Sequence, residues 1–158
     1  MSYTRDFGEI SARYRCAGEV EQSILSASTV GRYVATGDMT NGQFGLFEWE
    51  MRPGAGARAG HFHKTFSESF YVTSGSVSLF NGETWITATK GDFFYVPQGG
   101  VHAYHNDSGS PSSMLVVFAP GAPREEYFRE LARISAEGRQ LSEDEWTELW
   151  ARYDQYRA

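Results

Sequence analysis

Three histidines and one glutamate have the residue types and the spacing of a metal-binding site. His61 and His63 are separated by one residue, so on an extended strand both imidazoles point to the same face. Glu68 follows after a short break and could face the same space, and His102 offers a third imidazole further along the chain. Three imidazoles and one carboxylate suit a first-row divalent metal ion, and the lack of sulfur in the set argues against a structural zinc knuckle.

This ligand set would leave part of the coordination sphere open. An ion that prefers octahedral coordination could bind water, dioxygen or a substrate beside its protein ligands. We expect one divalent ion, with Fe, Ni or Mn preferred and Zn or Cu as alternatives. The choice among these metals stays open, because the order of metal affinities alone does not decide which metal a protein binds in cells. His105 is left out of the set, since alternation along a strand places it on the face opposite to His102.

The region from 43 to 120 must position these ligands, and its pattern is that of a β protein. Short apolar and aromatic runs alternate with turn residues, at a spacing typical of sandwiches and barrels. Asn81-Gly82 predicts a hairpin with a type I′ turn, in which both residues have positive φ. Strands are expected at Phe44–Met51, Ser69–Thr73, Val77–Phe80, Thr84–Thr87, Asp92–Val96, His102–Asn106 and Met114–Ala119.

After this region the apolar pattern changes to the period of an α-helix. An apolar stripe predicts a first helix that begins at Pro123 and ends at Gly138. A second helix is expected to begin at Ser142, with Glu145 as its capping-box partner. We expect its apolar face to pack on the barrel or on a second subunit rather than to bind a cofactor. That face consists of Trp146, Leu149, Trp150 and Tyr153.

The chain of 158 residues therefore divides into three zones. Residues 1–35 are expected to form an N-terminal arm that packs on the barrel and contributes one or two strands or a short helix. Residues 36–121 form the barrel, and residues 122–158 form a C-terminal helical extension. A chain of this length can bury a core without disulfides, and its single cysteine, Cys16, excludes an internal disulfide.

Composition narrows the partners and the location. The formal net charge of -6 makes nucleic acid an unexpected partner, because an acidic surface repels phosphates. No apolar run approaches the roughly 18 residues that cross a bilayer, so no membrane partner is expected. The N-terminus lacks the basic and apolar regions of a secretory signal, and we expect a cytoplasmic protein.

Two stretches of the sequence resemble the conserved motifs of the cupin superfamily. The first motif is Gly, five residues, His-x-His, three or four residues, Glu, six residues, Gly. It is matched by His61, His63, Glu68 and Gly75, whereas Ala55 replaces the leading glycine, which serves a turn and binds no metal. The second motif is Gly, five residues, Pro-x-Gly, two residues, His, three residues, Asn. It is matched in full by Gly91, Pro97, Gly99, His102 and Asn106.

The resemblance implies a mainly β fold, a double-stranded β-helix (cupin or jelly-roll) barrel, here followed by the two C-terminal α-helices. It also implies that His61, His63, Glu68 and His102 converge on one metal ion inside the barrel. Within the superfamily the chain is most similar to the single-domain group that resembles quercetin 2,3-dioxygenase. This similarity implies a metal-dependent dioxygenase that acts on a small aromatic or enolic, flavonol- or polyketide-like, compound.

Other functions remain open for the same ligands. One alternative is a non-redox cyclase or isomerase of polyketide-type metabolism, and another is a small-molecule-binding protein without turnover. Glu68 is expected either to remain a ligand or to act as general base, and the hydroxyl of Tyr104 is expected to contact the substrate. Cupins commonly pair, so a homodimer is expected. The predicted substrate pocket consists of Phe66, Phe70, Val72 and Tyr104, with ordinary barrel core as the alternative for Phe70 and Val72.

Overall fold

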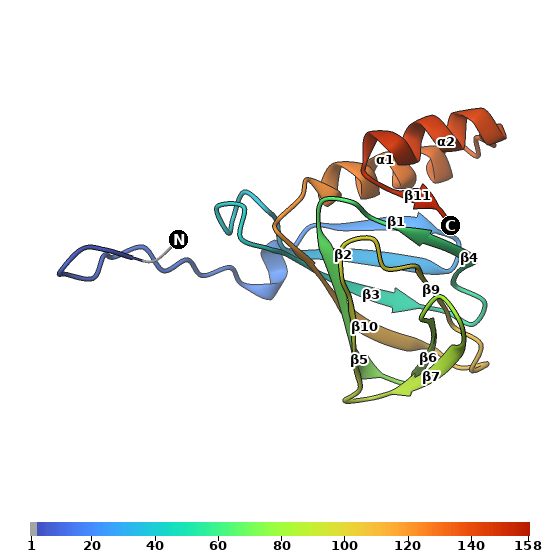
Figure 1. Ribbon diagram of the computed structural model, residues 1–158, viewed down its shortest axis with the longest axis horizontal. Helices are drawn as coiled ribbons and strands as arrows, with labels where there is room; N and C mark the ends of the chain where they lie inside the picture. Colours follow the sequence, from blue (N-terminus) through green and yellow to red (C-terminus); the bar gives the residue numbers. More distant parts are fainter. Residues whose placement is uncertain (1–2) are drawn as a thin grey trace.

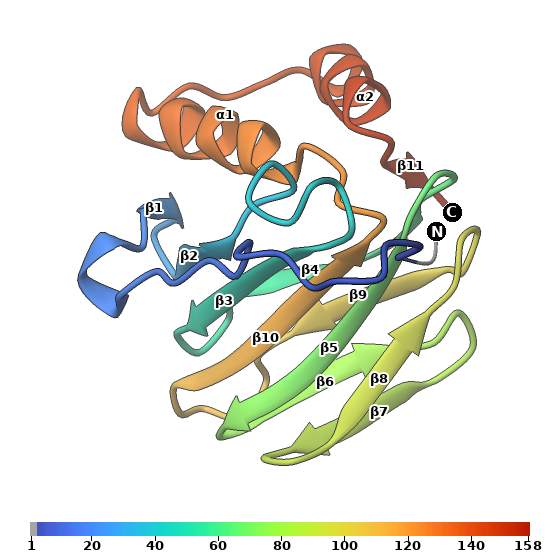
Figure 2. The same ribbon diagram turned by 90° about the vertical axis from the view of Figure 1, so that its left-hand side faces the viewer.

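The computed structural model describes residues 3–158, in which two facing β-sheets enclose a barrel (Figures 1 and 2). The six-stranded sheet has the order β1 (Gln22–Ser26), β2 (Thr29–Ala35), β3 (Gly45–Met51), β10 (Ser112–Ala119), β5 (Ser67–Ser74) and β8 (Phe93–Val96). The five-stranded sheet has the order β11 (Tyr156–Arg157), β4 (Gly56–Phe62), β9 (His102–His105), β6 (Ser76–Phe80) and β7 (Trp85–Thr89). The non-sequential strand orders are those of a double-stranded β-helix, so the expected fold class is confirmed.

Both expected C-terminal helices are present and lie together at one side of the barrel (Figure 2). They are α1 (Arg124–Ala136) and α2 (Glu143–Arg152), and a 3-10 turn, η1 (Ala17–Glu19), precedes the first strand. The predicted capping box is confirmed, because Ser142 Oγ accepts from the backbone N–H of Glu145 while Glu145 accepts from the N–H of Ser142. Among residues 3–158 no helix is long and apolar enough to cross a membrane.

Side-chain alternation along β3 decides which face forms the core. Phe47, Trp49 and Met51 are buried, whereas Glu48 and Glu50 point outward. The same alternation in β10 and β5 aligns Phe47, Val116 and Phe70 across three neighbouring strands. The barrel interior is therefore a layer of apolar and aromatic side chains beneath the predicted ligands.

The first helix closes one end of this interior. Phe128 of α1 is buried, and the centroid of its ring lies 4.7 Å from that of Trp49 and 5.2 Å from that of Phe47. On the outer side of the helix, Arg129 donates two hydrogen bonds to the carboxylate of Glu21, at 2.8 and 2.7 Å. The helical extension is thus fixed on the barrel by buried aromatic contacts and by an ion pair at its edge.

The N-terminal zone contributes two strands and a 3-10 turn, in agreement with the one or two strands or short helix expected of the arm over 1–35. Strands β1 and β2 belong to the six-stranded sheet, with β2 paired to β3, and much of the described segment before η1, from residue 3 onward, extends away from the barrel (Figure 1). Gly31 interrupts the apolar pattern of β2 because the ring of Trp49 occupies the space of a side chain there. A Cβ on Gly31 would lie 2.7 Å from that ring.

The hairpin predicted at Asn81-Gly82 is confirmed, but the type of its turn is not. Gly82 has a positive φ of 94°, whereas Asn81 does not have a positive φ, so the expected type I′ turn is wrong. The side-chain oxygen of Asn81 instead accepts from the backbone N–H groups of Glu83 and Thr84, at 2.9 and 2.8 Å. This asparagine stabilises a four-residue loop between β6 and β7 by an Asx-type turn.

Candidate metal centre

The four predicted ligands come together in the barrel. One potential ligand atom from each of His61, His63, Glu68 and His102 lies within 4.8 Å of all the others. His63, Glu68 and His102 are buried, and His61 is half-buried. The structure therefore brings together every residue of the set that the sequence nominated, while His105 on β9 pairs with Asp107 outside it.

Strand pairing explains why histidines far apart in the sequence meet. His61 on β4 is directly opposite His102 on β9, so the two imidazoles share one face, with ring centroids 4.2 Å apart. The register of β4 against β9 shifts between Ala57 and His61, so the ladder is irregular beside the site. Glu68 at the start of β5 enters from the other sheet.

Glu68 is the centre of the cluster. Its Oε2 lies 3.1 Å from Nε2 of His63 and 2.9 Å from Nε2 of His102. Burial acts to raise the pKa of Glu68, but the hydrogen bonds and charges of His102 and His63 outweigh it and hold the pKa well below the ordinary value. A buried carboxylate that keeps its charge, surrounded by imidazole nitrogens, is a donor set that fits a first-row divalent ion.

Backbone carbonyls orient two of the imidazoles. The Nδ1–H of His63 donates to the carbonyl oxygen of Asp154 at 2.6 Å, and the Nδ1–H of His102 donates to that of Gly100 at 3.0 Å. In each ring the Nε2 atom then faces the carboxylate of Glu68. This is the arrangement by which histidine ligands are fixed in one tautomer and one orientation.

The surroundings of His61 favour its neutral form. Burial, followed by the neighbouring charge of His102, lowers the pKa of His61 to about 3. At neutral pH one of its two ring nitrogens is therefore unprotonated and can bind a cation.

The remaining motif residues hold the ligand loops in place. The N–H of Gly99 donates to the carbonyl oxygen of His63 at 2.7 Å, which joins the second motif to the first. The side chain of Asn106 is buried and donates to the carbonyl oxygens of Met51 and Ser110, at 3.1 and 2.8 Å. At the departure from the first motif, Ala55 is fully buried, and its neighbour Gly56 has a positive φ of 97°.

A cavity of about 430 Å³ adjoins His61, between the barrel and the C-terminal helices. The irregular part of β4 gives it a wall of small residues, and α1 and α2 give it an aromatic wall. Tyr104 and Gln155 add polar groups near the histidine. The lining consists of Leu25, Ser26, Thr29, Trp49, Gly56, Ala57, Ala59, Gly60, His61, Tyr104, Tyr127, Phe128, Leu131, Trp146, Trp150, Gln155 and Arg157.

The predicted pocket residues occupy different places. Tyr104 lines the cavity beside His61. Phe66 stacks on the ring of His63, with 4.4 Å between ring centroids, and lines a separate small cavity. Phe70 and Val72 lie in the hydrophobic core, so their side chains pack in the barrel interior and do not line the cavity beside His61.

Two residues of the predicted packing face of α2 also line this cavity. Trp146 and Trp150 of α2 line the cavity and stack on each other, with ring centroids 5.4 Å apart, whereas Leu149 of the same face is fully buried. Helical spacing of aromatic residues is the same for a packing face and for a cavity wall, so the pattern alone could not separate the two functions.

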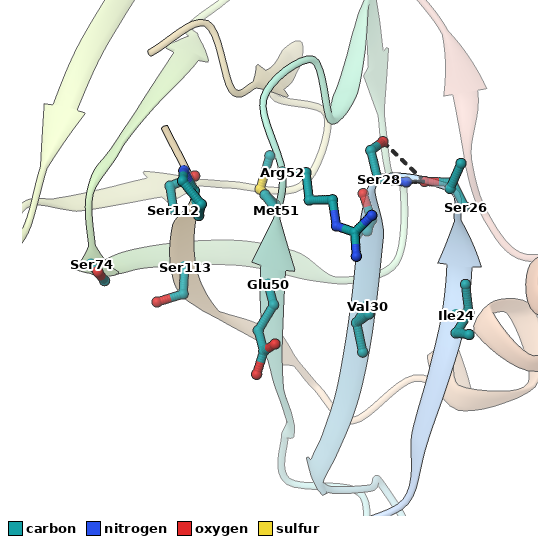
Figure 3. A pocket seen from close by; sticks show the side chains of 13 residues that line it. Ile24, Ser26, Ser28, Val30, Glu50, Met51, Arg52, Ser74, Ser112 and Ser113 are labelled. Atoms are coloured by element: carbon teal, nitrogen blue, oxygen red, sulfur yellow. Dashed lines mark hydrogen bonds between the residues drawn. The ribbon is translucent and has the colours of Figure 1, made fainter. Parts of the chain in front are cut away.

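A larger cavity of about 590 Å³ lies at the end of β5 that is remote from Glu68 (Figure 3). Serine side chains line much of it, and the side chain of Arg52 lies above those of Glu50 and Val30 in this view. Both Glu50 and Arg52 are exposed. The four clustered ligands are absent from its lining, whereas His61 lines the smaller cavity.

Known proteins resemble this chain in sequence and in fold. The family model described as "Cupin domain" matches residues 47–118. The quercetin 2,3-dioxygenase of Bacillus subtilis is 32% identical over 108 residues, which cover 68% of this chain and 31% of that protein. This chain thus spans about a third of the length of that relative.

Solved structures share the fold at lower identity. The polyketide cyclase RemF from Streptomyces resistomycificus has a TM-score of 0.59 and 22% identity, over 68% of this chain and 79% of that one. A cupin sugar phosphate isomerase from Silicibacter pomeroyi has a TM-score of 0.59 and 22% identity, over 68% and 75%. These likenesses establish the fold alone. The chain matches the family model, contains both sequence motifs and brings their ligands together inside the barrel. The protein therefore belongs to the cupin superfamily.

Proposed function

We propose that this protein is a metal-dependent dioxygenase that acts on a small aromatic or enolic compound of the flavonol or polyketide kind. The observation that carries the proposal is the position of the aromatic cavity, which adjoins the cluster of three histidines and a glutamate at His61. The sequence similarity to a quercetin 2,3-dioxygenase supports the same reaction class.

His61, His63, Glu68 and His102 would hold the ion, with Fe, Ni or Mn preferred over Zn or Cu. A divalent ion bound there would supply Lewis acidity toward a substrate oxygen and, if redox-active, the electron transfer that dioxygen chemistry requires. The barrel core around Phe70 and the stacked ring of Phe66 keep bulk water away from the ligands.

Two side chains would act on the substrate itself. Glu68 lies at the ligand cluster and stays ionised, so it could accept the proton of a substrate hydroxyl or remain a ligand throughout. Tyr104 lines the cavity, and burial followed by the nearby charge of Glu68 raises the pKa of its hydroxyl. A phenol that stays neutral donates a hydrogen bond and would orient an oxygen of the substrate.

Elemental analysis of protein purified without added metal or chelator tests the proposal, together with dioxygen consumption on a panel of flavonols and enols. Near-stoichiometric Fe, Ni or Mn with substrate-dependent oxygen uptake would support it. Bound zinc without oxygen uptake on any compound of the panel would overturn the dioxygenase in favour of a non-redox reaction. Protein that binds no divalent metal would overturn the metal site as well.

A non-redox cyclase or isomerase is the second candidate. The neutral hydroxyl of Tyr104 favours it, because a hydrogen-bond donor beside a Lewis acid polarises a carbonyl group without any change of oxidation state. Product analysis under anaerobic conditions separates the two candidates, since a cyclisation or isomerisation continues without dioxygen. Stoichiometric small-molecule binding without turnover in air would instead favour a binding protein.

We also propose a homodimer and a cytoplasmic location. Tyr71, Phe93 and Tyr95 expose 44%, 65% and 58% of their surface on the outer face of β5 and β8, and such patches often form interfaces. Light scattering would measure a dimer, and Phe93→Glu should shift it toward monomer. The single cysteine is compatible with a reducing compartment.

A further inference from the structure

We infer that Asp154, in the turn after α2, is a positioning residue for the metal ligand His63, so that the C-terminal extension forms part of the metal site. The inference concerns metal binding and not the reaction, and it holds for a dioxygenase and for a non-redox enzyme alike. Asp154 lies outside the region that the cupin family model matches. The family motifs therefore do not supply this contact.

The backbone of Asp154 contacts the ligand directly. Its carbonyl oxygen accepts the Nδ1–H of His63 at 2.6 Å, across 91 positions of sequence. The residue has a positive φ of 55°, a conformation that costs energy for a non-glycine residue and that aspartate tolerates better than most. This conformation lies at the point where the chain leaves α2 and turns toward β11.

The side chain of Asp154 contacts the loop that follows the ligand. Its carboxylate accepts from the backbone N–H of Lys64 at 3.1 Å and from that of Thr65 at 2.8 Å. It also accepts from the hydroxyl of Thr65 at 2.6 Å. One residue thus fixes the ring of His63 through its carbonyl group and the loop behind that ring through its carboxylate.

Contacts of the residues on either side of Asp154 fix its backbone next to the metal site. The buried guanidinium of Arg124 donates to the carbonyl oxygen of Tyr153 at 2.8 Å and to the side chain of Gln155 at 3.3 Å. On the other side, β11 pairs with β4, and Arg157 lies directly opposite His61. Asp154 is therefore held from both directions, and its carbonyl group can set the orientation of His63 rather than follow it.

The physical role follows from imidazole chemistry. A hydrogen bond from Nδ1–H fixes the tautomer that leaves Nε2 free to bind a metal, and it keeps the ring from turning out of the site. Without the carboxylate, the loop at Lys64 and Thr65 loses its acceptor and the carbonyl group of Asp154 loses its fixed distance from the ring. The result expected is a weaker metal site in a barrel that still folds.

The affinity of the metal-free protein for Co²⁺, measured by competition with a chelator, tests the inference. Asp154→Ala should weaken Co²⁺ binding by about 10- to 100-fold, the range found when contacts to metal-ligating histidines are lost. The visible spectrum of bound Co²⁺ should change with the altered ligand geometry. Asp154→Asn should recover most of the affinity, because its amide oxygen still accepts hydrogen bonds and asparagine tolerates positive φ.

Two further variants separate positioning from general stability. Asp144→Ala changes an exposed aspartate in the first turn of α2 and should leave Co²⁺ affinity unchanged. Thr65→Val removes a partner of the carboxylate by an isosteric change, and its effect on affinity should not add to that of Asp154→Ala. If Asp154→Ala fails to fold, Thr65→Val carries the test, and a Co²⁺ affinity in Thr65→Val equal to that of the wild type would overturn the inference.

The inference would be overturned by a folded Asp154→Ala protein that binds Co²⁺ within about twofold of the wild type with the same spectrum. It would also be overturned if that variant lost thermal stability alone, since Asp154 would then only hold the extension in place. Neither readout depends on turnover, so a failure here is distinct from a failure of the proposed reaction.

Discussion

The indole N–H of Trp49 donates a hydrogen bond to the hydroxyl oxygen of Tyr104 at 3.2 Å. Because an indole can only donate, the oxygen of Tyr104 must be the acceptor, and the phenol proton remains available. Both residues line the cavity beside His61. The pair therefore presents a neutral hydrogen-bond donor to whatever binds next to the ligand cluster.

Tyr104→Phe should lower kcat by about tenfold to hundredfold, because it removes one donor aimed at the reacting part of the substrate. Metal content should stay at the wild-type level, since Tyr104 is not among the clustered ligands. Steady-state kinetics and elemental analysis of the same preparations measure both effects. A phenylalanine variant with unchanged kcat would exclude the proposed role of this hydroxyl.

Stability should fall in alkaline solution because of buried tyrosines. Burial is the main cause that raises the pKa of Tyr104 and of Tyr127 in the folded protein. In the unfolded chain both ionise near pH 10, so their stabilising contribution is complete below that pH and is lost as the pH rises toward the folded pKa.

The loss should be on the order of 1 kcal/mol per pH unit for each tyrosine that stays neutral in the folded state. Urea unfolding at pH 9 and pH 11 measures it, and Tyr104→Phe should show a smaller loss than the wild type. Tyr71→Phe, at an exposed tyrosine on β5, is the control. Equal losses in wild type and Tyr104→Phe would contradict the assignment.

The metal ligands were predictable because their chemistry is local in the sequence. The i, i+2 spacing of His61 and His63 directs both imidazoles to one side, with His63 directly after the end of β4. The glycines of both motifs have backbone conformations that other residues adopt poorly. The convergence of His61 and His102 followed from the family resemblance, but their pairing directly opposite each other on β4 and β9 is seen only in the structure. The shifted register in β4 that accompanies it depends on tertiary structure and leaves no local pattern.

The residues around the ligands were less predictable. The contact between Asp154 and His63 spans 91 positions, and nothing near either residue in sequence indicates it. Trp146 and Trp150 have helical spacing, which packing and cavity walls produce equally. Phe70 and Val72 follow Glu68 on one strand face, but the side chains of neighbouring strands decide that this part of the face is core.

His63→Ala should reduce metal affinity more than about 100-fold and remove turnover, because it removes a ligand and not merely a contact to one. His105→Ala is the matched control, since His105 is a histidine on the neighbouring strand β9 but pairs with Asp107 at 2.8 Å outside the cluster. Elemental analysis and Co²⁺ titration compare the two variants. Equal metal retention in both would show that the cluster is not the metal site.

Glu68→Gln separates the two roles of the glutamate. The glutamine side chain has nearly the same shape and can still offer an oxygen to the metal, but it cannot take up a proton at neutral pH. If Glu68 is a general base, metal content should stay largely intact while kcat falls by about 100-fold or more. Unchanged turnover in this variant would exclude the base role, and loss of metal alone would favour a permanent ligand.

Trp150 should determine how well flat substrates bind. Its half-buried ring stacks on that of Trp146 within the cavity, and the guanidinium of Arg157 on β11 lies 4.7 Å from the centroid of the Trp150 ring. Trp150→Leu removes an aromatic surface worth about 1 kcal/mol in stacking, so KM for a planar substrate should rise about fivefold to tenfold while kcat changes little.

Trp150→Phe should retain most of the affinity, because a phenyl ring still offers a flat face to the cavity. Trp85→Leu serves as the control, since Trp85 on β7 is 39% exposed and packs on Phe80 outside the cavity lining. Steady-state kinetics on one planar and one non-planar substrate measure the ratio of kcat/KM for each variant. An aromatic cavity wall that stacks on the substrate must favour the planar compound. If the ratio of kcat/KM for the planar over the non-planar substrate is the same in Trp150→Leu, Trp85→Leu and wild type, α2 does not contact the substrate.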